Sequence, residues 1–149
     1  MIALKGAPVS AKMKDEIDEQ KKALSGPAPK LGIVRVGERP DDLSYERGAL
    51  KRMEKLGLAA ESFVFPQDIS HEAFEKEFLA INEDPAIDGI LLLRPLPKQI
   101  DEDKITRLID PEKDLDGISP TNIAKVFSGD ETGFAPCTAE AVIEVLKAY

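Results

Sequence analysis

Two aspartates follow an apolar segment that ends in prolines, and this arrangement is the clearest indication of a chemical site in the sequence. The four apolar residues Ile90 to Leu93 suit a strand that is buried on both faces of a parallel sheet. Pro95 and Pro97 lack amide hydrogens, so the hydrogen-bond ladder of that strand must stop there. Ligands of open α/β sheets bind beyond the carboxyl ends of the strands. Asp114 and Asp116 lie close enough in sequence to reach such a site.

Other arrangements that support catalysis or ligand binding are missing from the sequence. No Gly-x-Gly-x-x-Gly follows a predicted strand, and no Gly-x-x-x-x-Gly-Lys-Ser/Thr occurs, so no phosphate-binding loop is predicted. His71 is the only histidine and Cys137 the only cysteine, which leaves no metal-ligand spacing and no nucleophile–histidine pair. We expect no metal site, a solvated His71 in the first turn of a helix, and a Cys137 that is a small buried thiol rather than a nucleophile.

The composition predicts one ordinary globular domain. The 149 residues are 42% hydrophobic and 32% charged, which is typical of a water-soluble chain with its own core. The net charge of −8 argues against binding to nucleic acid or to an anionic membrane. No window approaches the roughly 18 apolar residues of a membrane span, and the first residues do not read as an export signal. A single cysteine fits a reducing compartment, so we expect the protein in the cytoplasm.

Helical and extended patterns alternate along the chain. The predicted helices cover residues 9–24, 41–56, 70–81, a short stretch around 105–109, and 138 to the terminus; the predicted strands cover 31–36, 61–65 and 87–94. Ser70 and Thr138 are the expected N-caps of two helices, and Gly57 is the expected stop of another. Short connections between strands and helices imply right-handed parallel crossovers. The sequence therefore predicts an α/β fold, a three-layer sandwich with a mainly parallel sheet flanked by helices.

Several segments occur in a specific combination and order. They are Pro29–Gly37, Pro40–Gly57 around Tyr45, Asn82, Gly89–Pro97, Ile109–Gly117, Pro120–Asn122 and Phe134–Thr138. With these segments the chain resembles the N-terminal catalytic domain of bifunctional methylenetetrahydrofolate dehydrogenase/methenyltetrahydrofolate cyclohydrolase over nearly its whole length.

The resemblance implies that residues 1–149 are a folate-binding catalytic domain in one-carbon metabolism and purine biosynthesis. It implies a folate-type small molecule as substrate and NADP or NAD as cofactor. The family holds that cofactor in a following Rossmann-type domain, which is absent from this chain, so we expect the isolated chain to bind no cofactor and to transfer no hydride. We also expect the chain to be a fragment of a longer polypeptide, whose full-length form is compatible with a homodimer.

The functional residues of the family transfer unevenly to this sequence. The resemblance assigns the pterin-binding aspartate to Asp116, and a tyrosine that contacts substrate and takes part in catalysis to Tyr45. The family's central lysine is Ala49 here, its serine is Asp42, and its glutamine is Leu93, which keeps a place in the substrate site without the polar group. Each retained residue also has a structural interpretation: Tyr45 can simply pack, and Asp116 can cap the turn that follows it.

Three further positions complete the expected site. Arg94 adjoins the strand end, where it either supplies positive charge to substrate at the mouth of the cleft or is a solvated cap, the commoner role. Thr138 lies at the family's domain junction and is the expected contact with the cofactor, although it also suits a helix N-cap. Lys51 is two residues beyond Ala49, about 200° around a helix, so it points away from the face that Tyr45 presents.

The missing lysine and glutamine predict a weakened second activity. Cyclohydrolysis needs activated water and proton transfer, and losing the acid–base group typically reduces a rate by about 10²–10⁴-fold. We therefore expect a dehydrogenase domain with weak or absent cyclohydrolase activity. The alternative is a pseudoenzyme that acts as a folate-binding or interaction module. A third reading is an unrelated substrate that uses Asp42 and Arg94.

Overall fold

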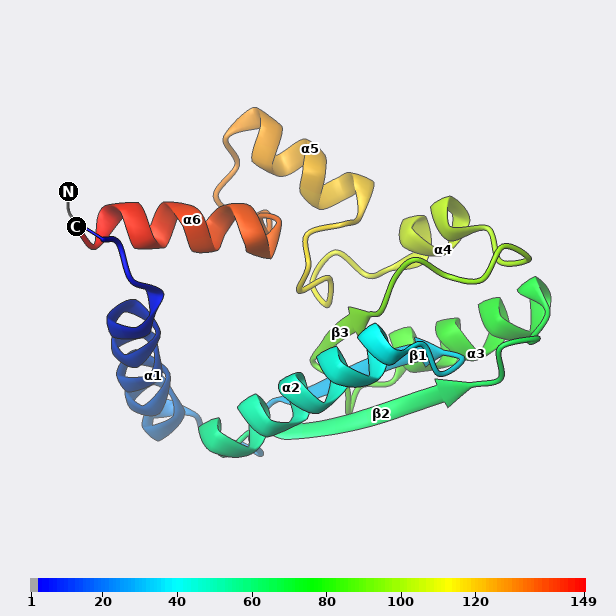
Figure 1. Ribbon diagram of the computed structural model, residues 1–149, viewed down its shortest axis with the longest axis horizontal. Helices are drawn as coiled ribbons and strands as arrows, with labels where there is room; N and C mark the ends of the chain where they lie inside the picture. The colour runs from blue at the N-terminus through cyan, green and yellow to red at the C-terminus, as the bar shows by residue number, and fades with distance from the viewer. Residues whose placement is uncertain (1–2) are drawn as a thin grey trace.

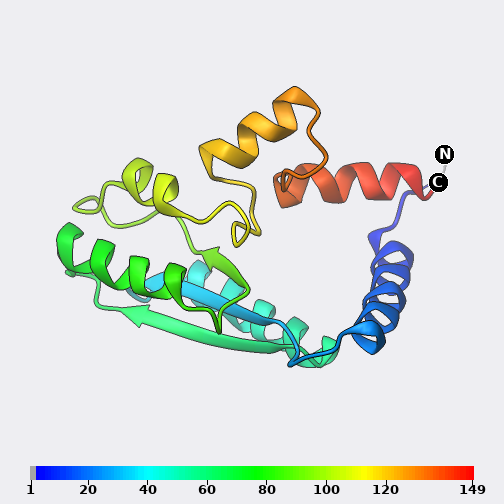
Figure 2. The same ribbon diagram turned by 180° about the vertical axis from the view of Figure 1, so that it is seen from behind.

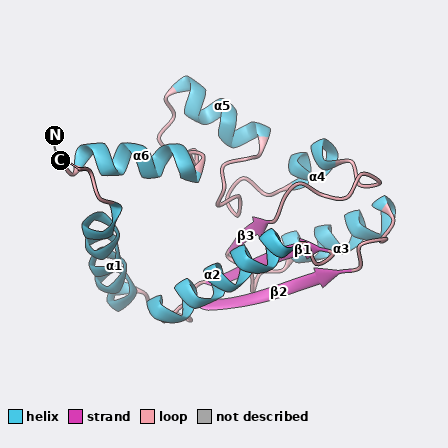
Figure 3. Cartoon of the chain, viewed as in Figure 1, coloured by secondary structure: helices cyan, strands magenta, loops and turns pink. Residues whose placement is uncertain are grey.

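A parallel three-stranded sheet forms the centre of the computed structural model, which describes residues 3–149 (Figures 1 and 3). Strand β1 (Lys30–Val36) lies between β2 (Ala59–Phe65) and β3 (Gly89–Leu92), and both neighbours run parallel to it. Residues 31–36 of β1 are all buried, as expected for a central strand that is covered on both faces. Strand β3 is shorter than the predicted 87–94, although the Leu93 amide still donates to the Val34 carbonyl at 2.9 Å.

Helices cover both faces of this sheet, which confirms the predicted α/β sandwich. Helix α2 (Pro40–Leu56) lies on one face, whereas α3 (His71–Glu83) lies on the other, as the front and back views show (Figures 1 and 2). The short α4 (Glu102–Leu108) adds to the α3 side. One cluster packs beneath α2 and contains Leu31, Ile33, Leu91 and Leu93. The larger cluster packs on the α3 side and includes Val34, Phe74, Phe78, Leu92 and Ile105.

Local signals in the sequence set the ends of these helices. The Ser70 hydroxyl accepts a hydrogen bond from the Ala73 amide at 3.2 Å, which confirms it as the N-cap of α3. Gly57 ends α2 in the left-handed conformation, with a φ of 61°, which confirms the predicted stop. Pro40 occupies the start of α2, where its missing amide hydrogen is not needed.

The outer helices lie away from the sheet. Helices α1 (Gly6–Ala23) and α6 (Cys137–Lys147) contain no buried residue, and Figure 1 shows them meeting near the two chain ends. Helix α5 (Pro120–Ser128) was not predicted, although Ser119 caps it by accepting from the Asn122 amide at 3.2 Å. Within residues 3–149, no helix is both long and apolar enough to span a bilayer.

Candidate active site

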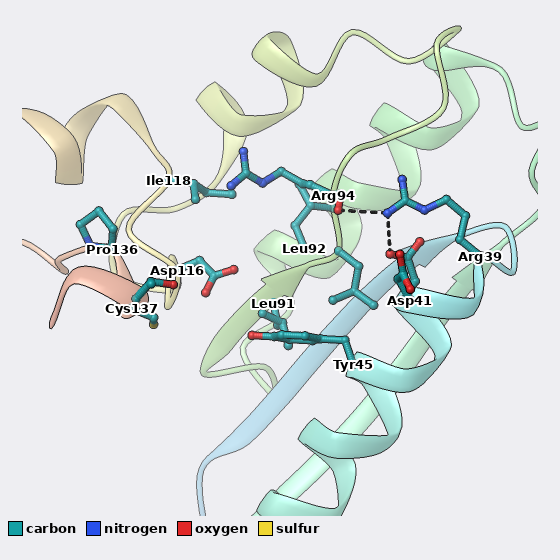
Figure 4. Close-up of a pocket in the computed structure, with 13 residues that line it drawn as sticks. Arg39, Asp41, Tyr45, Leu91, Leu92, Arg94, Asp116, Ile118, Pro136 and Cys137 are labelled. Carbon is teal, nitrogen blue, oxygen red and sulfur yellow. Dashed lines mark hydrogen bonds and ion pairs between the residues drawn. The ribbon is translucent and has the colours of Figure 1, made fainter. Parts of the chain in front are cut away.

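A cavity of about 540 Å³ lies where the end of β3, the start of α2 and the start of α6 come together. Figure 4 shows its main residues. It is lined by Arg39, Asp41, Asp42, Tyr45, Leu91, Leu92, Leu93, Arg94, Asp116, Ile118, Pro136, Cys137 and Thr138. The cavity brings together Tyr45, Leu93, Arg94, Asp116 and Thr138, which the sequence assigned to the site, but not Asp114. It lies at the carboxyl end of the central strands, as expected for an open α/β sheet. We call this cavity the cleft.

Tyr45 presents its ring to the cleft. It lies on the second turn of α2, remains 58% exposed, and directs its hydroxyl toward the segment that carries Asp116 (Figure 4). Partial burial raises the pKa of the Tyr45 phenol, and the nearby Asp116 and Cys137 raise it further. The phenol is therefore neutral at physiological pH, and its open ring face can receive a flat aromatic ligand.

Asp116 faces the same cleft from the loop between α4 and α5. Partial burial raises the pKa of its carboxyl group above the ordinary value, while the adjacent Cys137 thiol and the positive charge of Arg94 act in the opposite direction. A half-buried carboxylate of this kind favours a ligand that donates hydrogen bonds to it, because such donors replace the lost water.

Asp114, the other member of the doublet, has a structural role instead. Asp114 is 1% exposed and does not line the cleft, so of the two aspartates close enough in sequence to reach the site, only Asp116 does so. Its carboxylate accepts from the Ile118 amide at 3.1 Å, the Ser119 amide at 2.8 Å and the Asn122 side chain at 3.0 Å. Burial opposes ionisation, but the hydrogen bonds from Asn122, Ser119 and Ile118 prevail and lower the pKa of Asp114. This network holds the loop that presents Asp116.

The floor of the cleft is apolar where the strand ends. Leu93 is 7% exposed, lines the cleft and packs with Leu91 in the cluster beneath α2. Arg94 also lines the cleft, but its guanidinium lies 3.4 Å from the Glu102 carboxylate, which in turn accepts from the Leu96 amide at 2.8 Å. Arg94 thus occupies the cleft mouth and is paired there.

Arg39 is a cleft residue that sequence reasoning missed. Its guanidinium lies 3.0 Å from the buried carboxylate of Asp42 and donates to the Pro95 and Arg94 carbonyls at 3.2 and 3.4 Å. Asp42 is therefore the ion-pair partner of Arg39. The position of Arg39 just after β1, at the same sheet edge as the end of β3, was the signal that could have identified it.

Two positions on α2 follow the predicted geometry. Ala49 packs against the sheet and shares a hollow with Tyr45 next to the cleft, so the two residues do face the same side. Lys51 is exposed and lines neither cavity. Among residues 3–149, no lysine lines either cavity, so no other amine replaces the lysine that was expected at the position of Ala49.

The residues at the start of α6 differ from the predictions. Thr138 lines the cleft, but the prediction of an N-cap is wrong, because the helix begins at Cys137 after Pro136 without a side-chain cap. Cys137 is exposed rather than buried, and its thiol donates to the Leu115 carbonyl at 3.0 Å. Partial burial and the charge of Asp116 raise the pKa of this thiol, so it stays protonated and is a poor nucleophile.

His71 lies outside the cleft, at the start of α3. His71 is not the solvated residue that was predicted: its ring lies 3.1 Å from the Glu75 carboxylate and accepts from the Asp101 amide at 3.3 Å. It joins α3 to the start of α4, away from the cleft. Across residues 3–149, no group of three His, Cys, Asp or Glu side chains is arranged to hold a metal ion.

Comparison with known proteins agrees with this geometry. The family profile described as tetrahydrofolate dehydrogenase/cyclohydrolase, catalytic domain, matches residues 4–116. The chain is 48% identical over 148 residues to the bifunctional protein FolD of Alkaliphilus metalliredigens. The matched region covers 98% of this chain and 52% of that protein. The structure of the bifunctional FolD methylenetetrahydrofolate dehydrogenase/cyclohydrolase from Campylobacter jejuni matches with a TM-score of 0.93 at 33% identity, covering 98% of this chain and 52% of that one. The Trypanosoma brucei FolD, solved with NADP cofactor and inhibitor, matches with a TM-score of 0.84 at 29% identity, covering 96% and 48%.

The fold and the cleft define an α/β domain with a candidate ligand site at the carboxyl edge of a parallel sheet. The chain belongs to the tetrahydrofolate dehydrogenase/cyclohydrolase catalytic domain family. It spans about half the length of the curated relatives that it matches.

Proposed function

We propose that this chain binds a reduced folate in the cleft, as the substrate-binding catalytic domain of an NAD(P)-dependent methylenetetrahydrofolate dehydrogenase whose cyclohydrolase step is impaired. One observation carries the proposal: Asp116 and Tyr45, which come from distant segments, line the same cavity. Family membership supplies the substrate class. Family membership also supports a role in one-carbon metabolism, and the single cysteine supports a reducing compartment such as the cytoplasm.

The cleft offers a matched set of contacts for a pterin. The two oxygens of the Asp116 carboxylate suit the adjacent N–H groups on one edge of the pterin ring, in a charge-assisted pair of hydrogen bonds. The apolar floor at Leu91 and Leu93 suits the face of a heterocycle, and the open ring of Tyr45 suits stacking with the rest of the ligand. Together these groups bind and orient the substrate.

For dehydrogenation, these residues need mainly to align the substrate with the cofactor. The nicotinamide supplies the hydride acceptor when it is bound, but the described residues do not fit the pyrophosphate of such a cofactor. The helix after β1 starts with Pro40, which has no amide hydrogen, and carries Asp41 in its first turn, where its negative charge repels phosphate. We therefore assign cofactor binding to a domain outside this chain, with Thr138 at the rim of the cleft as a contact.

Cyclohydrolysis requires an acid–base group in addition to substrate alignment, and the residues that line the cleft do not supply one. Neither lysine nor histidine lines the cleft. Arg39 and Arg94 are each paired with a carboxylate. Ala49 has no proton to give, and Leu93 has no dipole with which to orient water. These features support an impaired cyclohydrolase step.

The same features favour a second candidate, a pseudoenzyme that retains folate binding without catalysis. Both candidates need a working pterin site, and they differ in the activity of the full-length protein. A dehydrogenase assay on the full-length protein separates them, because only the first candidate predicts turnover of methylenetetrahydrofolate with NAD(P).

Calorimetric titration of this chain with tetrahydrofolate tests the shared claim. We expect saturable binding at one site per chain, together with hydrolysis of methenyltetrahydrofolate no faster than in buffer. The absence of binding at high ligand concentration would refute the proposal, and rapid hydrolysis would refute the impaired cyclohydrolase step.

A further inference from the structure

A second hollow adjoins the cleft along α2. It is lined by Asp41, Ser44, Tyr45, Gly48, Ala49, Arg52 and Leu91. Three of these residues, Asp41, Tyr45 and Leu91, also line the cleft, so the two cavities meet at the Tyr45 ring. A ligand longer than the cleft can continue past Tyr45 into this hollow. We call it the α2 hollow.

Small residues open the α2 hollow between Tyr45 and Arg52. Gly48 and Ala49 occupy the helical turn between them, and a Cβ atom added at Gly48 would meet no atom within 4 Å. Arg52 follows Tyr45 by seven residues, which places it on the same side of α2 and about 10 Å further along the axis. The α2 hollow is thus a corridor with an aromatic ring at one end and a guanidinium at the other.

Arg52 differs from the arginines of the cleft in its side-chain partner. Arg39 and Arg94 in the cleft are each paired with a carboxylate, at 3.0 and 3.4 Å. Within residues 3–149, the Arg52 guanidinium has no carboxylate in ion-pair range, and its side-chain partner is the Ser10 hydroxyl of α1 at 3.4 Å. Its planar fork is therefore open to a carboxylate, in a chain whose net charge is −8.

The chemistry of a folate matches this corridor. A folate consists of a pterin, an aminobenzoyl ring and one or more glutamates, so its carboxylates lie at the end opposite the pterin. When the pterin binds Asp116 and the aromatic ring stacks on Tyr45, the tail leaves the cleft beside α2. Asp41, the acidic residue that lines the α2 hollow, precedes Arg52 by eleven residues, about 16 Å along the helix axis, too far to neutralise it.

We propose that the α2 hollow binds the glutamate tail of a reduced folate, and that Arg52 donates hydrogen bonds to the carboxylates of that tail. This site rests on the proposed function, since it presumes a pterin at Asp116. It assigns a specificity role to Arg52: folates with more glutamates bind more tightly, because each added carboxylate increases the negative charge near this guanidinium.

The test compares three ligands that share a reduced pterin and differ in their tails. They are tetrahydropteroate, which has no glutamate, tetrahydrofolate, which has one, and tetrahydrofolate triglutamate. Calorimetry measures their dissociation constants for the wild-type chain, for Arg52→Gln, and for the control Arg47→Gln, which changes an exposed arginine of α2 that lines neither cavity. Circular dichroism verifies that each variant is folded.

Arg52→Gln should weaken triglutamate binding by about 2- to 5-fold, the range for an exposed ion pair, and leave tetrahydropteroate binding unchanged. The loss should shrink as salt is added, and Arg47→Gln should leave all three constants unchanged. The tail site is overturned if Arg52→Gln weakens the binding of all three ligands equally or weakens none of them. In that case, binding of tetrahydropteroate to the wild-type chain would still support the proposed function. If the wild-type chain binds none of the three, the proposed function and the tail site both fail.

Discussion

The hydroxyl of Tyr45 points across the cleft toward Asp116 (Figure 4). Partial burial is the main cause of the raised pKa of the phenol, and the Asp116 carboxylate is the second cause. The phenol therefore stays neutral, and the cleft combines a hydrogen-bond acceptor on one wall with a neutral aromatic face on the other. This pairing suits a ligand that carries N–H donors at one end of a chain of flat rings.

Substitution of Tyr45 should separate stacking from hydrogen bonding. Tyr45→Ala should weaken tetrahydrofolate binding by about 10-fold, since aromatic stacking contributes roughly 0.5–1.5 kcal/mol beyond the buried area. Tyr45→Phe keeps the ring and should bind within about twofold of the wild type. Calorimetry gives both constants, and a Phe variant that loses as much affinity as the Ala variant would show that the hydroxyl is the important group.

Asp116→Asn should stabilise the unliganded chain at neutral pH. The folded-state pKa of Asp116 is raised, so its carboxyl favours folding below the unfolded-state pKa, and that contribution is lost as pH rises through the folded-state value. Asparagine resembles the protonated form, so the gain over wild type should be present near pH 7 and shrink toward about pH 4. Urea unfolding at several pH values measures it. A variant that is less stable than wild type at neutral pH would contradict the assigned direction of the shift.

Asp114→Asn should have the opposite effect. The folded-state pKa of Asp114 is lowered, so its carboxylate stabilises the fold above the unfolded-state pKa, and this contribution is lost as pH falls through the folded-state value. The amide cannot accept from all three donors of Ile118, Ser119 and Asn122, so we expect a loss of about 2–4 kcal/mol near pH 7. Glu112→Gln, an exposed change in the same segment, is the control and should alter stability by less than about 0.5 kcal/mol. If Asp114→Asn and Glu112→Gln were equally stable, the structural role of Asp114 would be contradicted.

Restoring an amine and an amide should recover cyclohydrolase activity. Ala49→Lys combined with Leu93→Gln places an amine beside Tyr45 and a dipole at the strand end, and we expect a gain of about 10²-fold or more in hydrolysis of methenyltetrahydrofolate. Ala49→Met with Leu93→Gln fills similar space without a titratable group and should show no gain. Equal activity of the Lys and Met variants would mean that the amine is not what the cleft lacks.

The sheet and its covering helices could be predicted from the sequence because their signals are local. The buried strand around Ile33, the Ser70 cap and the Gly57 stop each depend on a few neighbouring residues. Helix α5 was missed although its signals are also local: Ser119 caps its start, Pro120 occupies its first turn, and Gly129 ends it with a φ of 75°.

The site was harder to predict, because its pairings join distant segments. Asp114 and Asp116 are equivalent in sequence, and only the bonds from Ser119 and Asn122 show that the first is structural. The contacts of Arg39 with Asp42 and with the carbonyl of Pro95 depend on how the ends of β1 and β3 meet. Such contacts follow from the tertiary packing rather than from any pattern along the chain.

The most direct test of the pterin site is a double-mutant cycle between Asp116 and the pterin. The dissociation constants of tetrahydrofolate and its 2-desamino analogue are measured for wild type and for Asp116→Asn. If the carboxylate receives the pterin N–H groups, wild type should prefer tetrahydrofolate by about 10-fold or more and the variant should lose most of that preference, a coupling of about 1.5 kcal/mol. A coupling near zero, with both proteins discriminating equally between the two ligands, would contradict the binding of a pterin at Asp116.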